Sequence, residues 1–159
     1  MKNIIEQVKA LTKKKENISP SIITAYRWQG AGDGSLLVCK ENGSFLYYQS
    51  AEDLTNNYFE GSYEFYMGNE AVKYITTTLK EYGVTQKKLK QVWSRNNEYD
   101  ISNFICFVLN NETCMMDGQN VLEQPCRTPY FGFCLKQEDG WYFDVANMNT
   151  ANYYYFIAV

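Results

Sequence analysis

The sequence predicts an α+β fold in which an N-terminal helix and a central helical hairpin pack on an antiparallel sheet of about seven or eight short strands. Two helical stripes, short runs rich in β-branched and aromatic residues, and turns that contain glycine are the observations behind this prediction. Strand-rich segments lie on both sides of a helical middle, which is typical of α+β proteins. Since the chain has 159 residues, we expect residues 1–159 to form one α+β domain.

The first half predicts a helix followed by a three-stranded meander. Apolar residues at helical spacing, from Ile4 to Leu11, predict a helix over residues 2–15. The strand-like runs are residues 22–28, 35–40 and 45–49. Between the last two runs, Asn42 and Gly43 predict a hairpin with a type I′ turn, because both central residues of that turn need a positive φ.

The middle of the chain predicts helices. Ser50 and Asp53 favour the start of a short helix that ends near Tyr58. The next helix has an apolar stripe formed by Val72, Ile75, Leu79 and Tyr82. Gly83 is typical of the left-handed residue that ends a helix, and Thr85 favours the start of another. These last two helices would form the helical hairpin.

The second half predicts a return to strands. The expected strands are residues 101–109, 112–116, 130–136, 141–145 and 153–159. Residues 104–108 are apolar at every position, so we expect both faces of this strand to be covered. Asp139 and Gly140 predict a hairpin turn between two of these strands.

The sequence contains no histidine, which excludes Ser-His-Asp and Cys-His catalysis and the common zinc motifs. The five cysteines form no Cys-X-X-Cys pair, and their odd number does not indicate a disulfide framework. We therefore expect buried, inert thiols, no catalytic residue, no bound metal and no cofactor. These patterns predict a binding protein rather than an enzyme.

The N-terminal sequence and the apolar runs predict a cytoplasmic protein. Lys2, Glu6 and Lys9 interrupt the apolar residues that a signal peptide would need. The longest apolar runs are far shorter than the roughly 20 residues of a membrane-spanning helix. We expect no membrane partner.

The charges alternate in blocks along the chain. Residues 1–30 hold six basic and two acidic residues, and residues 71–95 hold six and one. Residues 31–70 hold one basic and seven acidic residues, and residues 96–159 hold two and eight. The blocks predict lysine-rich helices and acidic strands and loops.

Acidic strands with many tyrosines indicate a surface that binds a basic protein. Opposite potentials speed the encounter of two proteins, and tyrosine offers a rigid contact area. The sequence therefore predicts an inhibitor of a basic protein, either an immunity-type protein or a phage counter-defence protein. The candidate contact residues are Tyr47, Tyr48, Tyr58, Glu60, Tyr63, Glu64 and Tyr66.

Two alternatives remain open. Residues 133–145 are similar to the last hairpin of cone-shaped NTF2-like domains, and that resemblance implies a small-molecule-binding or structural domain with an apolar pocket. The likeness covers these residues alone, and the meander after a single helix departs from that family's helix-rich start. Residues 83–93 resemble the second helix of a helix-turn-helix, but no recognition helix follows, so nucleic-acid binding is the least favoured function.

Overall fold

The computed structural model describes residues 27–30, 34–50, 52–53, 55–93, 100–137 and 140–158. The helix predicted over residues 2–15 lies outside these ranges. The described strands are β1 (Arg27–Gly30), β2 (Leu36–Cys39), β3 (Ser44–Tyr48), β4 (Tyr58–Met67), β5 (Phe104–Met116), β6 (Gln119–Asn120), β7 (Cys126–Gln137), β8 (Gly140–Asn147) and β9 (Tyr153–Ala158). The described helices are α3 (Asn69–Thr77), α4 (Gln86–Trp93) and the 3-10 turns η1 (Lys80–Tyr82) and η2 (Ile101–Asn103). This architecture agrees with the predicted antiparallel α+β class.

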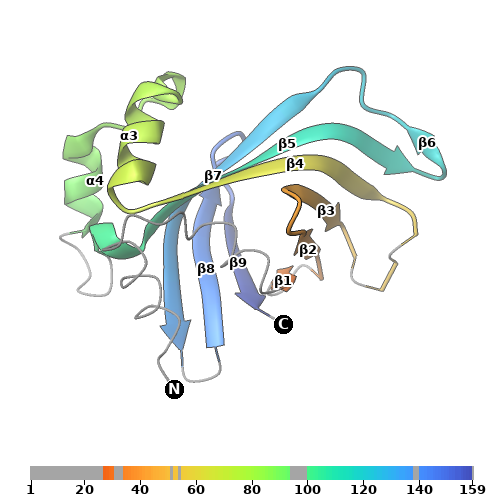
Figure 1. Cartoon of the computed structure of the whole chain (residues 1–159), viewed down its shortest axis with the longest axis horizontal. Coiled ribbons are helices and arrows are strands. Elements are labelled where there is room, and N and C mark those ends of the chain that lie inside the picture. Colours follow the sequence, from red (N-terminus) through yellow and green to blue (C-terminus); the bar gives the residue numbers. More distant parts are fainter. Residues whose placement is uncertain are drawn as a thin grey trace.

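The strand pairing closes on itself. Strands β1 to β5 pair antiparallel in sequence order, and β5 then pairs with β7, β7 with β8 and β8 with β9. Strand β9 returns to β1 through the pairs Trp28 with Ala158 and Gln29 with Ile157. Eight strands thus form a ring, and the short β6 pairs only with the end of β5. Figure 1 shows the long strands β4, β5 and β7 curving over the shorter ones.

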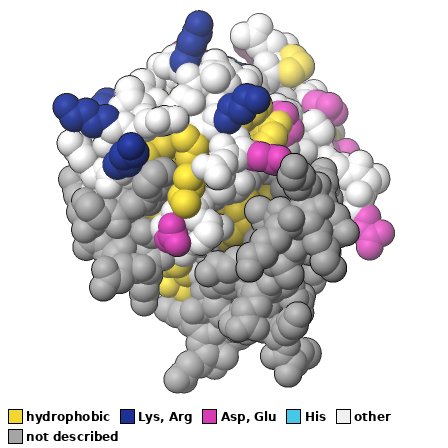
Figure 2. All heavy atoms as spheres, turned by 60° about the vertical axis from the view of Figure 1, so that its left-hand side comes forward, with side chains coloured by type: hydrophobic (Ala, Val, Ile, Leu, Met, Phe, Trp, Pro, Cys, Tyr) yellow, Lys and Arg dark blue, Asp and Glu magenta, His cyan; other side chains and the backbone are white. Residues whose placement is uncertain are grey.

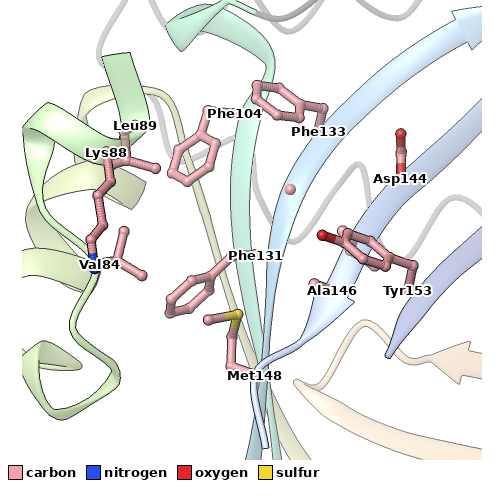
Figure 3. Close-up of a pocket in the computed structure, with 12 residues that line it drawn as sticks. Val84, Lys88, Leu89, Phe104, Phe131, Phe133, Asp144, Ala146, Met148 and Tyr153 are labelled. Carbon is pink, nitrogen blue, oxygen red and sulfur yellow. The ribbon is translucent and has the colours of Figure 1, made fainter. Parts of the chain in front are cut away.

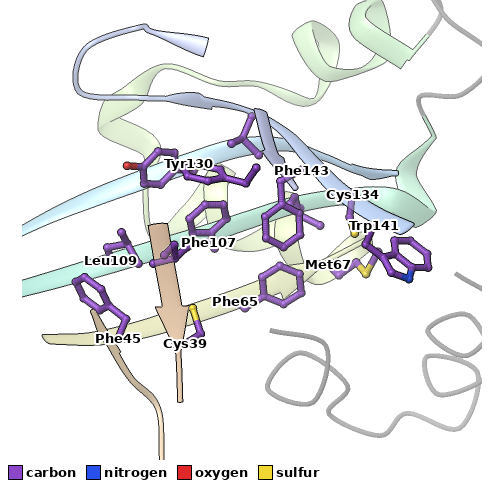
Figure 4. Close-up of a cluster of buried hydrophobic side chains, with 14 residues drawn as sticks. Cys39, Phe45, Phe65, Met67, Phe107, Leu109, Tyr130, Cys134, Trp141 and Phe143 are labelled. Atoms are coloured by element: carbon purple, nitrogen blue, oxygen red, sulfur yellow. The ribbon is translucent and has the colours of Figure 1, made fainter. Parts of the chain in front are cut away.

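The inside of the ring is filled by large apolar side chains (Figure 4). Phe107 lies near its centre, with its ring stacked on Tyr130 at a centroid distance of 4.6 Å. Phe143 and Phe156 contact the same ring, at centroid distances of 5.4 and 6.3 Å. Since a ring of eight strands encloses just enough space for side chains or one small ligand, this aromatic filling accounts for most of the interior.

A second core lies on the outer face of the ring, beneath the helices. Ala71, Val72 and Ile75 of α3 are buried in it together with Leu79. Outward-facing residues of the sheet complete this core: Phe104, Cys106, Val108, Phe131, Phe133, Leu135 and Tyr142. Strand β5 alternates between the two cores, because its even-numbered residues 104–108 face the helices and its odd-numbered ones face the interior. The prediction that both faces of this segment are covered is confirmed.

Two short helices, α3 and α4, and the 3-10 turn η1 lie in the segment that was predicted as a helical hairpin. Helix α3 ends at Thr77 and η1 follows, and Gly83 ends this segment with a left-handed φ of 74°. The Thr85 hydroxyl accepts a hydrogen bond from the backbone N–H of Lys88, as expected for a helix start. None of the helices in the described ranges has the length and apolarity that crossing a bilayer requires.

Two local predictions were wrong. The Asn42-Gly43 hairpin has a three-residue loop in which Gly43 alone has a positive φ, so the turn is not type I′. The Asp53 carboxylate accepts hydrogen bonds from the backbone N–H groups of Thr55 and Asn56, and these lower its pKa. The segment predicted as a short helix forms bends around this Asp-centred turn in its described part.

Gly132 is expected to tolerate no side chain. It faces the interior where β7 and β8 approach closely, and an added Cβ would overlap the backbone carbonyl oxygen of Asp144. We expect Gly132→Ala to lower the free energy of unfolding by about 3 kcal/mol, measured by urea denaturation. Gly118→Ala is the control, because open space surrounds Gly118 and only its positive φ opposes a side chain, at a cost of about 1 kcal/mol. Equal losses in the two variants would contradict the close approach.

Candidate functional site

The seven candidate contact residues of the sequence do not share one surface. Tyr47 and Tyr63 pack against the interior core, so these two do not belong to an outer surface. The Tyr63 hydroxyl donates a hydrogen bond to the backbone carbonyl of Lys40. The other five face outward along β3 and β4 and fall into two groups. These groups are Tyr48, Tyr58 and Glu60, and Glu64 with Tyr66.

The first group forms part of a surface that we call the distal face, made of Tyr48, Tyr58, Glu60 and Met115. Tyr58 pairs with Tyr48 on one side and with Met115 on the other, so three outward side chains stand in a row. The rings of Tyr48 and Tyr58 have a centroid distance of 5.7 Å. Glu60 stands in the next outward row and is exposed.

Met115 was missed by the sequence reasoning. The segment from residue 112 to 116 was expected to be a strand, but nothing in the sequence assigns its neighbour in the sheet. A bulge between Glu60 and Gly61 also shifts the register between β4 and β5, which decides which residue faces Tyr58. Beyond Met115, the end of the β5–β6 hairpin exposes Met116 and Val121, at 40 % and 51 %.

Exposed carboxylates occur on β4 and β5 and in the loops between β2 and β3, β3 and β4, β5 and β6, and β6 and β7. The described ones are Glu41, Glu52, Glu60, Glu112, Asp117 and Glu123. Exposed lysines concentrate instead on the helical segment: Lys73, Lys80, Lys87, Lys88 and Lys90. Figure 2 shows basic side chains over the helices and most acidic ones toward the opposite side. The predicted division between basic helices and acidic strands is therefore present among the described residues.

The distal face and the lysine-rich helices lie at opposite ends of β4. Tyr58 begins this strand, and α3 follows directly after its last residue, Met67. Ten residues of extended chain span about 30 Å. This separation exceeds the Debye length of about 8 Å at physiological salt, so the lysines of the helices do not cancel the acidic potential at the distal face.

The second group, Glu64 and Tyr66, is held in a polar cluster beside α3. Glu64 Oε1 accepts hydrogen bonds from the hydroxyls of Tyr66 and Tyr74, at 2.8 and 3.4 Å. The Asn110 amide donates to Oε2 at 3.2 Å. The Tyr66 and Tyr74 rings stack at a centroid distance of 4.0 Å. Burial, followed by the hydrogen bond to Glu64, raises the pKa of Tyr66. These contacts give Glu64 and Tyr66 a role in attaching α3 to the sheet.

An apolar groove of about 430 Å³ runs between α4 and the outer face of the sheet (Figure 3). Phe131, Phe104 and Met148 lie between the helical wall and the strands, and Leu89 lines the groove from α4. Tyr153, which is 83 % exposed, lines the side formed by the last strands. A groove of this size can hold an apolar molecule or a peptide side chain.

The described residues offer no metal-binding cluster of three or more His, Cys, Asp or Glu side chains. Four of the five cysteines are buried, and all five are free thiols. Burial raises the pKa of Cys39, Cys106 and Cys134, which keeps these thiols protonated near neutral pH. Their surroundings fit the inert, buried role that the sequence predicts.

Comparison with known proteins gives no further information about the site. No family model matches the chain, and neither a curated protein nor a solved structure matches it.

Proposed function

We propose that this chain acts by binding another protein through the distal face, and that the partner presents a basic surface. The observation that carries the proposal is the row of Tyr48, Tyr58 and Met115 beside the exposed Glu60, within a region of exposed carboxylates. Such a surface combines rigid apolar contact area with a potential that attracts a basic partner. Tyrosine and methionine are also enriched in the centres of protein interfaces.

Inhibition is the form of binding that we propose. A protein without catalytic chemistry can block a basic protein by covering its functional surface, as an immunity-type or phage counter-defence protein would. Its lack of histidine supports a non-catalytic role. The free thiols support a reducing compartment, and we propose the cytoplasm.

The Glu60→Lys variant tests the role of charge. We expect it to slow association with the partner by about three- to tenfold at about 0.1 M salt, where the Debye length is about 10 Å. The difference should vanish near 1 M salt, where that length is about 3 Å. The partner would first be identified by affinity capture from the native host, and association rates would then be measured by surface plasmon resonance.

The control is Glu70→Lys, which makes the same charge change on the exposed face of α3. It should leave the association rate within about twofold of the wild type, because Glu70 lies at the far end of β4 from the distal face. Glu64→Lys is unsuitable because Glu64 accepts hydrogen bonds from Tyr66 and Tyr74. Equal slowing by Glu60→Lys and Glu70→Lys would reject the distal face, and a rate independent of salt would reject a basic partner.

The apolar groove beside α4 favours a second candidate, a domain that binds a small apolar molecule. Its floor of Phe131, Phe104 and Met148 would bury such a ligand. A series of apolar ligands that raises the melting temperature would support this function, because a ligand that binds only the folded state stabilises it. If Met148→Glu abolished that rise, the ligand would be located in the groove.

A further inference from the structure

A partly open cavity of about 190 Å³ lies at one end of the strand ring, apart from the groove and the distal face. Residues at the end of β3, the start of β4 and the start of β9 line it, including Tyr47, Phe59 and Tyr154. Tyr130 completes an aromatic wall and meets the Tyr154 ring edge-on at a centroid distance of 6.0 Å. An apolar protein cavity of about 150 Å³ takes up benzene, so this space is large enough for one six-membered ring.

Two buried asparagines also line this cavity, and each has an amide atom without a hydrogen bond among the described residues. Asn147 is 8 % exposed, and its Oδ1 accepts the backbone N–H groups of Asn149 and Thr150 at 2.9 and 3.3 Å. These two donors identify Oδ1, so Nδ2 is the atom that remains available to donate. This atom is not fully enclosed by protein, so a ligand in the cavity can replace solvent as its hydrogen-bond partner.

Asn111 supplies the complementary group. It is 4 % exposed, and its Nδ2 donates to Thr128 Oγ1 at 3.0 Å and to the Leu109 carbonyl at 3.4 Å. The carbonyl can only accept, which identifies Nδ2 and leaves Oδ1 as an acceptor without a described donor. Both asparagines line the same cavity, so a single small molecule in it can contact both residues.

We infer that this cavity binds a small, neutral, planar heterocycle of pyrimidine-base size that carries both a ring N–H and a carbonyl. The aromatic wall provides stacking and edge contacts for a flat ring. Asn147 Nδ2 donates to the carbonyl of the ligand, and Asn111 Oδ1 accepts its N–H. Among the described residues that line the cavity none is ionised, which favours a neutral ligand over a charged one.

Calorimetric titration with uracil, 2-pyridone and toluene tests this assignment on the full chain. We expect uracil or 2-pyridone to bind with a Kd between about 10 µM and 1 mM, since so few atoms limit the affinity. Toluene has the size and shape of the ligand but neither polar group, so it should bind at least about tenfold more weakly. Toluene binding as tightly as the polar rings, or no binding of either polar ring below about 10 mM, would overturn the inference.

Two variants locate the ligand. Asn147→Asp keeps the oxygen that accepts from Asn149 and Thr150 but removes the donor, and Asn111→Leu removes the acceptor. Each should raise the Kd of the polar ring by about tenfold or more. The control Asn149→Asp adds the same charge in the same turn on an exposed side chain outside the cavity lining, and it should change the Kd by less than about twofold.

Folding of each variant is checked by circular dichroism and by its melting temperature before titration. A folded Asn147→Asp variant and a folded Asn111→Leu variant that both bind with the wild-type Kd would overturn the assignment. This test involves no partner protein, so its outcome is separate from that of the docking experiment at Glu60.

Discussion

Raising the pH from 9 to 10.5 is expected to lower the free energy of unfolding by about 5 kcal/mol. Three thiols cause this effect: Cys39, Cys106 and Cys134 are buried, and burial raises the pKa of each above the ordinary value of 9.0. In the unfolded chain these thiols ionise near pH 9, whereas in the folded protein they stay protonated. The folded state therefore binds more protons above pH 9, and its stability falls as the pH rises.

The size of the loss in unfolding free energy follows from the number of protons that the thiols release on unfolding. Each group that ionises only in the unfolded state costs about 1.4 kcal/mol per pH unit once the pH is well above its unfolded pKa. At pH 9 the unfolded thiols are only half ionised, so the loss between pH 9 and 10.5 amounts to about 1.6 kcal/mol for each thiol. Tyr63, whose pKa burial raises to about 12 with a smaller contribution from Cys39, adds to the loss above pH 10.

Urea denaturation at a series of pH values measures this slope. Cys39→Ala removes one of these three thiols, so their contribution to the slope above pH 9 should fall by about one third, whatever the variant loses at neutral pH. Cys126→Ala is the matched control, because Cys126 is exposed and its replacement should leave the slope unchanged. A free energy of unfolding that stays constant to pH 10.5 would show that the thiols ionise equally in both states.

Local sequence patterns were sufficient to predict the structure where it depends on one residue or on one stripe of apolar side chains. Gly83 and Thr85 mark the helix boundaries because left-handed glycine and a capping hydroxyl act within one turn. Asp53 shows the limit of such signals. A side-chain oxygen that accepts nearby backbone N–H groups begins a helix in one context and an Asp-centred turn in another, and only the chain that follows decides between them.

The orientation of the candidate site could not be predicted in the same way. Phe45, Leu46, Tyr47 and Tyr48 are consecutive apolar or aromatic residues, so either phase of the strand alternation places large side chains inside the ring. Tyr47 faces the interior and Tyr48 the outer face because Leu37 and Leu36 of β2 are their partners. Local patterns could not predict the pairing of β1 with β9 either, because this pairing joins residues that are far apart in the sequence.

The interior explains the second large effect that we expect, which is the loss of about 4 kcal/mol of unfolding free energy in Phe107→Ala. Phe107 is 1 % exposed and contacts Tyr130, Phe143 and Phe156. These partners belong to three strands of a closed ring and cannot all move inward to fill the space of the missing side chain. The cost therefore includes both the lost burial and the cavity that remains.

Urea denaturation of Phe107→Ala measures this loss, and Tyr153→Ala serves as the aromatic control. Because Tyr153 is 83 % exposed, its truncation should cost less than about 0.5 kcal/mol. The cavity left by Phe107→Ala should also take up benzene, and a rise of its melting temperature in benzene that exceeds the rise of the wild type would locate the space. A loss below about 1.5 kcal/mol would mean that the neighbouring aromatic side chains move into the space of Phe107. That outcome would contradict a rigid, closed ring of strands.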